Sequence, residues 1–347
     1  AGFRGEEDRK QYDERYVDHG KYIDPITKKP VETADPNMIA SNDTKLSIND
    51  RKTFRNNNFL ILGGAGTGKS RFVIKPNLLQ ENCSYVVTDP SGEIIVSCGK
   101  VLSDHGYKIK IFNLSNMGHS NTYNPFNYIR DEAGVLMVID CLIKNTTGKN
   151  EKGDQFFTNS EKLLYSACIF YLIDFETDES RKNFSSVMDM INMSQVDENN
   201  PSSKSELDLM FEQIDQTSLA AKYYKAFKQA AGKTLKSIII SCVVRLQSFM
   251  TPQVTRLTGS DNINLASIGD EKTILFIITP QADRTFAFLA SMLYSQLFET
   301  LYHKGETQKL KTGSERLTYH VRCLMDEFAN IGEIPEFPSK LSTMRKY

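Results

Sequence analysis

The sequence predicts an α/β fold that is interrupted by an all-helical segment, and three observations support this prediction. Short apolar runs at 58–63, 85–88 and 273–278 are typical of buried parallel strands. Helix-forming stretches follow these runs, and alternation of strands with helices is typical of an open α/β sheet. From about residue 130 to residue 258 there is hardly a strand candidate. Helical stretches separated by turn-rich segments occupy that region, which indicates an inserted all-α unit.

The other elements follow from similar patterns along the chain. Residues 1–55 are rich in charge and in turn formers, and prolines interrupt any long periodicity, so we expect an extended lead-in. A helix is predicted over 69–80, a strand with alternating pattern over 108–112 and a long helix over 285–302. A last apolar strand over 321–325 leads into Asp326.

Composition limits the possible classes of protein. With 347 residues the chain has room for two domains, each with its own core. The net charge of −1 provides no general attraction to nucleic acid, so such binding would need a local patch. The chain has six cysteines, and no two of them form a CxxC pair. This argues against a zinc site and favours reduced thiols in the core. No apolar run reaches the roughly 18 residues that cross a bilayer.

A phosphate-binding loop is predicted directly after the first apolar run. Residues 63–70 read GGAGTGKS and fit the Walker A pattern, in which backbone N–H groups surround a β-phosphate at a helix N-terminus. Lys69 is expected to reach the β- and γ-phosphates, and the Ser70 hydroxyl to bind Mg²⁺. The predicted nucleotide-binding residues are Gly63, Gly64, Ala65, Gly66, Thr67, Gly68, Lys69 and Ser70.

Two adjacent acids at the end of the last strand supply the other half of this site. Asp326 is expected to hold Mg²⁺, and Glu327 to orient or deprotonate the attacking water. The NKxD signature that selects guanine does not occur, so ATP with Mg²⁺ is the predicted ligand. The GKT run at 232–234 lacks the first glycine of the pattern and is interpreted as a helix start.

Two weaker features concern charge. Arg345 lies nineteen residues after Asp326, where it is either a solvated side chain or an arginine that acts on a neighbouring subunit's phosphate. Residues 216–260 are basic and contain no acid, with Tyr223, Tyr224 and Phe227 interleaved. This stretch is either an ordinary solvated helical face or a DNA-binding patch with rings for base stacking. The candidate patch residues are Lys222, Lys225, Lys228, Lys233 and Lys236.

The ordered motifs resemble those of one family, the type IV coupling proteins of conjugation and type IV secretion. Residues 88–93 (TDPSGE) are similar to the family's DPKGE segment, with Ser91 where lysine is frequent. Residues 123–126 (YNPF) resemble its YNP segment, and residues 325–332 (MDEFANIG) resemble its DEFAxLG segment. The stretch 341–347 also resembles the family, so the resemblance runs from about residue 56 to the end.

The resemblance implies a RecA-like P-loop NTPase domain that carries an all-α domain. The expected units are a lead-in at 1–55, a nucleotide-binding domain at 56–129 and 263–347, and an all-α domain at 130–262. It also implies an N-terminal anchor in the inner membrane, absent from this chain, with the protein at the cytoplasmic face. A homo-hexamer would use ATP to pass relaxase and DNA to the type IV secretion channel.

For individual residues the resemblance implies less. Arg345 matches the family's arginine after the Walker B helix, which strengthens the case for a role on a neighbouring subunit, as a catalytic group beside Lys69 and Glu327. Asp89 and Glu93 match the acids of the DPKGE segment. The family's sheet continues past residue 347, so a chain that ends there is expected to hydrolyse ATP poorly.

Two other functions remain open at this point. The chain could be a docking platform whose helical domain recognises a protein cargo while nucleotide serves assembly. A related ring motor for chromosome partition is the third reading, which the coupling-type motifs disfavour.

Overall fold

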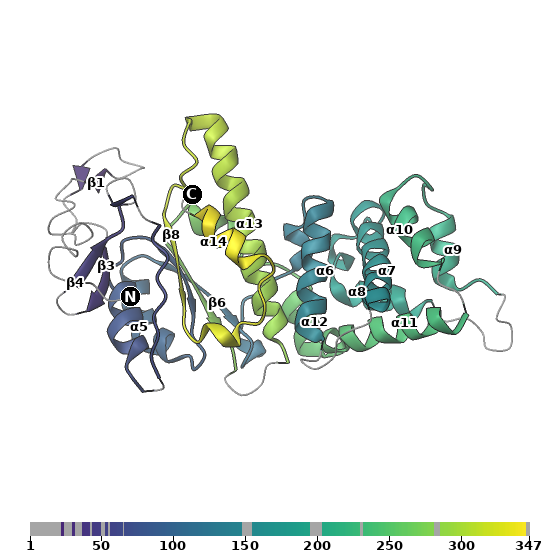
Figure 1. Ribbon diagram of the computed structural model, residues 1–347, viewed down its shortest axis with the longest axis horizontal. Helices are drawn as coiled ribbons and strands as arrows, with labels where there is room; N and C mark the ends of the chain where they lie inside the picture. The colour runs from purple at the N-terminus through teal and green to yellow at the C-terminus, as the bar shows by residue number, and fades with distance from the viewer. Residues whose placement is uncertain are drawn as a thin grey trace.

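A computed structural model shows a mixed α/β part and a group of helices, with the long helix α13 (Ala287–Thr312) at their junction (Figure 1). Two small antiparallel sheets lie in the N-terminal region, β1 (Tyr22–Ile23) with β2 (Pro30–Val31) and β3 (Asn37–Ser41) with β4 (Thr44–Ser47). The structure describes residues 22–23, 30–31, 37–41, 44–49, 53–54, 56–64, 66–147, 155–194, 203–229, 232–280 and 285–344.

A parallel four-stranded sheet forms the centre of the α/β part. Its strands are β5 (Ser84–Thr88), β6 (Lys108–Asn113), β7 (Thr273–Ile278) and β8 (Val321–Met325). Their spatial order is β6-β7-β5-β8, so strands from before and after the helical insertion alternate as neighbours. The predicted strands at 85–88, 108–112, 273–278 and 321–325 are confirmed.

The strand predicted at 58–63 is not part of this sheet. Residues 56–64 have no strand assignment, and Leu60 and Leu62 are each 84% exposed. A strand exists through hydrogen bonds to a neighbouring strand, and the edge strand β8 pairs with β5 alone within the described residues. The apolar residues at 58–63 therefore do not form a buried strand.

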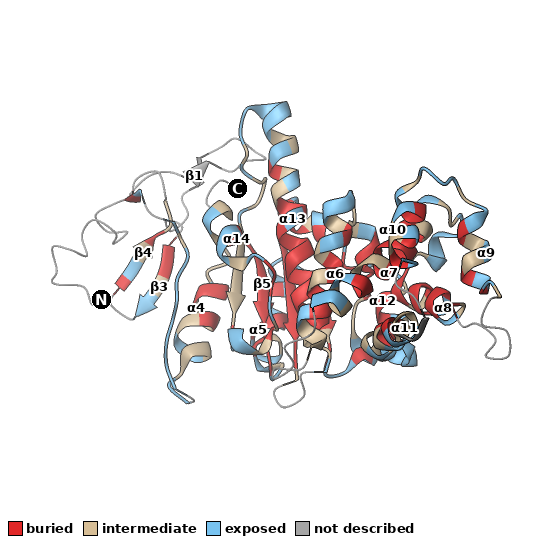
Figure 2. Ribbon diagram, turned by 45° about the vertical axis from the view of Figure 1, so that its right-hand side comes forward, coloured by how far each residue is buried: buried red, intermediate tan, exposed pale blue. Residues whose placement is uncertain are grey.

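Helices cover both faces of the sheet. A π-helical turn (Ser70–Ile74), α4 (Lys75–Leu78) and α5 (Glu93–Asp104) pack on one face, where Ile74, Leu78 and Ile94 meet Tyr85 and Phe276. On the other face the apolar side of α13 is buried between the sheet and the helical unit (Figure 2). The helices predicted at 69–80 and 285–302 are confirmed, and the short α14 (Phe337–Thr343) follows β8 along the chain.

The helical unit contains the elements that the sequence predicts. Its largest helices, α6, α7 and α11, pack together around one core, and α11 begins at Gly232 as expected for the GKT run. Glu161 on α7 is 1% exposed and is paired with Arg245 of α11 at 2.8 Å. The helices are α6 (Glu132–Thr146), α7 (Gln155–Asp174), α8 (Phe184–Asn192), α9 (Glu206–Glu212), α10 (Leu219–Phe227), α11 (Gly232–Leu246) and α12 (Pro252–Thr258).

The cysteines have the reduced state that the sequence favours. All six cysteines are free thiols, and five of them are buried. Among the helices of the described residues, none combines the length and the apolar character that crossing a membrane requires.

The guanidinium of Arg322 leads to a first prediction, on stability. Both of its terminal nitrogens are buried, and neither has a hydrogen-bond partner among the described residues. A buried polar group without a partner costs about 1–3 kcal/mol. We therefore expect Arg322→Met to raise the free energy of unfolding by about that amount, measured by urea denaturation. Arg322→Lys, which keeps a buried cation, is the control that should not stabilise. A lower stability of the methionine variant would contradict this account.

Candidate nucleotide-binding site

The phosphate loop predicted at 63–70 contains, among its described residues, two glycines with a left-handed backbone conformation. Gly66 has a φ of 73° and Gly68 a φ of 81°, which side-chain-bearing residues rarely adopt. A Cβ at Gly68 would also lie 2.4 Å from the ring of Phe72. These two glycines are therefore required for the turn into the following helix. Ala65 lies outside the described residues.

Lys69 lies against the loop itself. Its Nζ donates to the carbonyl oxygens of Gly63 at 2.8 Å and Gly64 at 2.9 Å, and Thr67 Oγ1 donates to the same Gly64 carbonyl at 2.9 Å. The ammonium group is thus held directly over the loop. A cation at this position is suited to bind the phosphate that the loop amides would surround.

The two predicted halves of the site meet through Ser70 and Asp326. Ser70 Oγ donates to Asp326 Oδ2 at 2.5 Å, although 256 positions separate the two residues in the chain. Asp326 follows β8 directly and is 9% exposed. A hydroxyl and a carboxylate oxygen side by side form the kind of hard-oxygen donor set that Mg²⁺ prefers. The residues present therefore fit the predicted ion.

Glu327 lies beside this pair in an uncommon conformation. Its φ is 45°, a left-handed value that costs free energy for a residue other than glycine. Asn330 Nδ2 donates to Glu327 Oε2 at 2.7 Å, and Glu327 N donates to Asp326 Oδ1 at 3.0 Å. These contacts fix where the second carboxylate points. The sequence did not single out Asn330, since it occupies the variable position of the motif.

Asp89 and Glu93 have different environments. Asp89 follows Thr88, whose partner in β8 is Met325, so Asp89 and Asp326 leave neighbouring strand ends. Burial raises the pKa of Asp89, although its Oδ2 accepts from the Ile95 N–H at 2.9 Å. Glu93 is exposed, and the 2.6 Å hydrogen bond from Lys75 lowers its pKa. The first acid thus accepts a hydrogen bond from the first turn of α5, while the second, the first residue of α5, pairs with Lys75 of α4.

The YNP segment joins the sheet to the helical unit. Tyr123 is buried and its hydroxyl donates to Gln296 of α13, whose Nε2 donates to the Pro125 carbonyl at 2.8 Å. Asn124 Oδ1 accepts from Phe126 N at 3.0 Å and Asn124 Nδ2 donates to the Lys182 carbonyl. These contacts explain why a tyrosine and an asparagine stand at this junction. Gln296, in the middle of an apolar helix, was not predicted.

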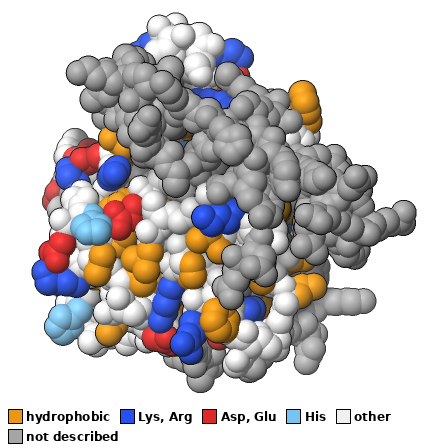
Figure 3. Space-filling model, turned by 90° about the vertical axis from the view of Figure 1, so that its left-hand side faces the viewer, with side chains coloured by type: hydrophobic (Ala, Val, Ile, Leu, Met, Phe, Trp, Pro, Cys, Tyr) orange, Lys and Arg blue, Asp and Glu red, His pale blue; other side chains and the backbone are white. Residues whose placement is uncertain are grey.

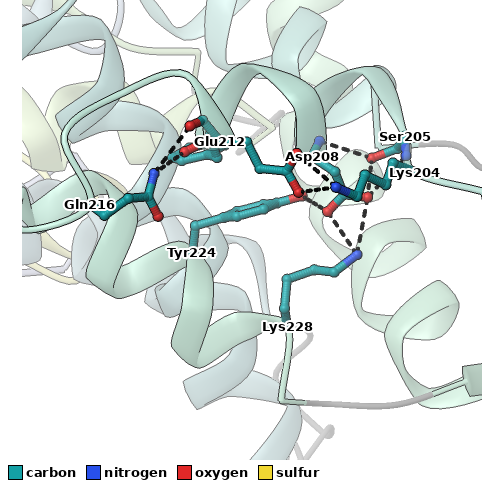
Figure 4. A network of polar contacts seen from close by, with 8 residues as sticks. Lys204, Ser205, Asp208, Glu212, Gln216, Tyr224 and Lys228 are labelled. Carbon is teal, nitrogen blue, oxygen red and sulfur yellow. Dashed lines mark hydrogen bonds and ion pairs between the residues drawn. The ribbon is translucent and has the colours of Figure 1, made fainter.

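The candidate DNA patch divides between two helices. Lys222 and Lys225 are exposed on α10, and Lys228 caps its C-terminus. Lys228 pairs with Asp208 of α9 at 2.9 Å, and Tyr224 donates to the same carboxylate (Figure 4). Burial alone raises the pKa of Asp208, but hydrogen bonds from Lys228, Ser205 and Tyr224 outweigh it and lower the pKa to about 2. The positive charge of Lys228 is therefore balanced by the carboxylate of Asp208. Two exposed lysines, Lys222 and Lys225, remain on α10.

Of the remaining basic residues that the sequence singled out, only Lys236 has a described side chain. Lys236 is exposed on α11, while Lys233 lies in the backbone of α11 with its side chain outside the described residues. Arg345 also lies outside the described residues. At the opposite, sheet end of the molecule, basic, acidic and hydrophobic side chains of the described residues are mixed (Figure 3). The visible charges of that face form no large area of one sign.

The prediction that the interleaved rings are available for base stacking is wrong. Tyr224 is 6% exposed and Phe227 is 1% exposed, and both contact Phe211 or one another in the core. Tyr223 is stacked on Phe170 at 5.6 Å. With Ala220, residues 224 and 227 follow the i, i+4, i+7 spacing of a helix's buried face. The same helix presents its lysines to solvent and its rings to the core.

A family comparison decides what kind of protein carries this site. Residues 20–347 match the family described as type IV secretory system conjugative DNA transfer. The chain belongs to this family. The match spans the phosphate loop, the acidic pair and the whole helical unit. A search of curated proteins by sequence finds none that matches.

Solved structures of a bacterial conjugative coupling protein share the fold. The bacterial conjugative coupling protein TrwBdeltaN70, unbound, matches with 15% identity and a TM-score of 0.52, over 82% of this chain and 58% of the other. TrwB with a non-hydrolysable ATP analogue matches with 14% identity and a TM-score of 0.54, and TrwB with ADP and Mg²⁺ with 16% and 0.53. Both of these alignments cover 82% of this chain and 60% of the other.

These likenesses confirm the predicted RecA-like α/β fold with an all-α domain. This chain spans about three-fifths of the length of the TrwB structures that it matches.

Proposed function

We propose that this chain binds and hydrolyses Mg²⁺·ATP and uses the reaction to drive conjugative DNA transfer. The observation that carries the proposal is the 2.5 Å contact of Ser70 with Asp326 beside a glycine loop with left-handed turns. The loop amides and Lys69 would bind the phosphates. Ser70 and Asp326 would hold the metal. The ATP analogue and the ADP with Mg²⁺ named for TrwB support a nucleotide with Mg²⁺ as the ligand. A GTP analogue is also named for TrwB, so the choice of ATP rests on the missing NKxD signature.

Different side chains of this protein would carry out different parts of ATP hydrolysis. When bound, Mg²⁺ supplies positive charge that stabilises the charge developing on the phosphates. Glu327, set by Asn330 and by its backbone bond to Asp326, would orient the attacking water and accept its proton. Arg345 is proposed to act on the nucleotide of a neighbouring subunit.

The cellular role that we propose is substrate coupling. A homo-hexamer at the cytoplasmic face of the cell membrane would deliver relaxase-bound DNA to the type IV secretion channel. Family membership supports this role. In that assembly, residues 56–129 and 263–347 would form the motor and residues 130–262 the all-α domain, with 1–55 as lead-in.

A docking platform is the second candidate function. The helical unit packs as one core, and its turn-rich segments at 145–154 and 197–203 include residues outside those described. In this alternative the unit would recognise protein cargo, and nucleotide would drive assembly. DNA would then have little effect on hydrolysis.

DNA-stimulated ATPase activity of the hexamer-forming protein tests the choice. We expect stimulation by single-stranded DNA and an affinity that falls with salt. Lys222→Glu and Lys225→Glu should each weaken binding and reduce the slope of log affinity against log salt by about 0.7. Lys311→Glu, an exposed lysine at the far end of α13, is the matched control. DNA affinity without salt dependence, together with tight relaxase binding, would favour the platform.

A further inference from the structure

Asn145 of the helical unit binds the backbone of the segment that follows the acidic pair. This residue lies in the last turn of α6. Its Oδ1 accepts from the Glu333 N–H at 2.7 Å, and its Nδ2 donates to the Glu333 carbonyl at 3.0 Å. The carboxamide thus binds both backbone groups of one residue, as a neighbouring strand would. Such a two-point contact fixes position and orientation together.

The surroundings are built to allow this contact. Gly332 has a φ of 91°, and a Cβ there would lie 2.4 Å from Asn145 Oδ1. Ser291 of α13 also donates to the Glu333 carbonyl, at 2.5 Å. Ile331 and Ile334, on either side, are buried in the core that the sheet shares with the helical unit. The segment is therefore held where α6 meets α13.

The same segment sets the conformation of Glu327. From Glu327 to Ile331 the chain forms one 3₁₀ turn, closed by Asn330 N to Glu327 O at 2.8 Å and Ile331 N to Phe328 O at 3.2 Å. Glu327 has a left-handed backbone that the surrounding structure must hold in place. The two-point contact lies two residues past the end of this turn. A displacement of α6 would consequently shift the 3₁₀ turn that contains both Glu327 and Asn330.

We infer that Asn145 is a positioning residue through which the all-α domain sets the orientation of Glu327, and so regulates hydrolysis without altering nucleotide binding. This inference rests on the proposed function, because it assigns regulation to that site. Within the part of the chain that the structure describes, the hydrogen bonds of Asn145 go to Cys141, Ser291 and Glu333 and to none of the predicted nucleotide ligands. Its effect would pass through Glu333, Gly332 and the 3₁₀ turn to the carboxylate.

Asn145→Leu removes both hydrogen bonds to Glu333, together with the Nδ2 bonds to the Cys141 carbonyl and to Ser291 Oγ, while keeping a similar shape. We expect the dissociation constant for ATP to change less than about two-fold, since the phosphate loop is untouched. The kcat should fall by about ten-fold or more, because a small displacement of a catalytic group has a large effect on rate. Amide hydrogen exchange at 327–333 should accelerate even without nucleotide. Gly332→Ala would push Asn145 away from Glu333, because its Cβ would lie 2.4 Å from Asn145 Oδ1. It should have the same effects on ATP affinity, kcat and hydrogen exchange.

Lys144→Ala is the matched control, because it breaks the 3.4 Å ion pair with the Glu333 side chain and leaves the backbone contact intact. It should leave kcat and exchange unchanged. If Asn145→Leu does not fold, Asn145→Asp, which keeps the acceptor and loses the donor, provides the same readouts. Unchanged exchange at 327–333 would overturn the inference. A parent protein without ATPase activity would overturn the proposed function instead, and the exchange result would still decide the role of Asn145.

Discussion

Replacing Lys69 with alanine is expected to reduce ATP affinity by at least about 100-fold. Each hydrogen bond to a charged group contributes about 1.5–3 kcal/mol, and two phosphate contacts are lost. Since 1.4 kcal/mol corresponds to a factor of ten, the expected loss is about 100- to 10,000-fold. Isothermal titration with ATP and Mg²⁺ would measure it.

Two further variants test whether the loss of affinity is specific to the ammonium group of Lys69. Lys69 also binds the carbonyls of Gly63 and Gly64, so its removal could loosen the loop. Lys69→Met keeps the aliphatic stem and should lose affinity as strongly as alanine. Arg71→Ala removes an exposed cation from the same turn, one whose guanidinium lies 5.5 Å from the Phe72 ring. It should bind ATP normally, and comparable losses in Lys69→Ala and Arg71→Ala would show that the loss at Lys69 is not specific to the phosphate loop.

Glu327→Gln should retain ATP binding and stop turnover. A general base contributes about 100- to 10,000-fold to a rate, so kcat should fall by about 100-fold or more. Glutamine keeps the side-chain oxygen that accepts from Asn330, so the local conformation is expected to survive. Phosphate release under single-turnover conditions, beside titration with ATP, would separate the two effects.

A neighbouring substitution of the same chemical kind is the control. Glu336→Gln changes an exposed carboxylate at the start of α14 and should hydrolyse ATP at the parent rate. If Glu327→Gln also turns over at the parent rate, the assignment of Glu327 as base is wrong. The metal-binding assignment of Ser70 and Asp326 would be unaffected by that result.

Sequence reasoning predicts correctly those elements that are buried along their whole length. β5 and β7 are buried on both faces, so an unbroken apolar run is a sufficient signal. Residues 58–63 have the same kind of run, but strand formation also depends on a neighbour, which the run itself does not encode. Leu60 and Leu62 therefore point into solvent despite their composition.

The site divides in a similar way. The proposed phosphate loop and acidic pair follow short motifs whose chemistry requires those residue types, so the sequence is enough to propose them. Asn145 and Asn330 act through hydrogen bonds that depend on tertiary placement, and no local pattern marks them. Gly332 in the final motif was the available signal, since its left-handed φ leaves room for Asn145. The rings at 224 and 227 could have been assigned to the core from their helical spacing.

The wide separation of Ser70 from Asp326 along the chain has a consequence for folding. Contacts between distant segments are slow to form, because the entropy of closing the intervening chain must be overcome first. If Ser70 and Asp326 hold the metal as proposed, a nascent chain that has completed its glycine loop would lack the second of these ligands until β8 has joined the sheet. Nucleotide would thus stabilise the finished topology selectively, and its presence during refolding should protect the last strand most.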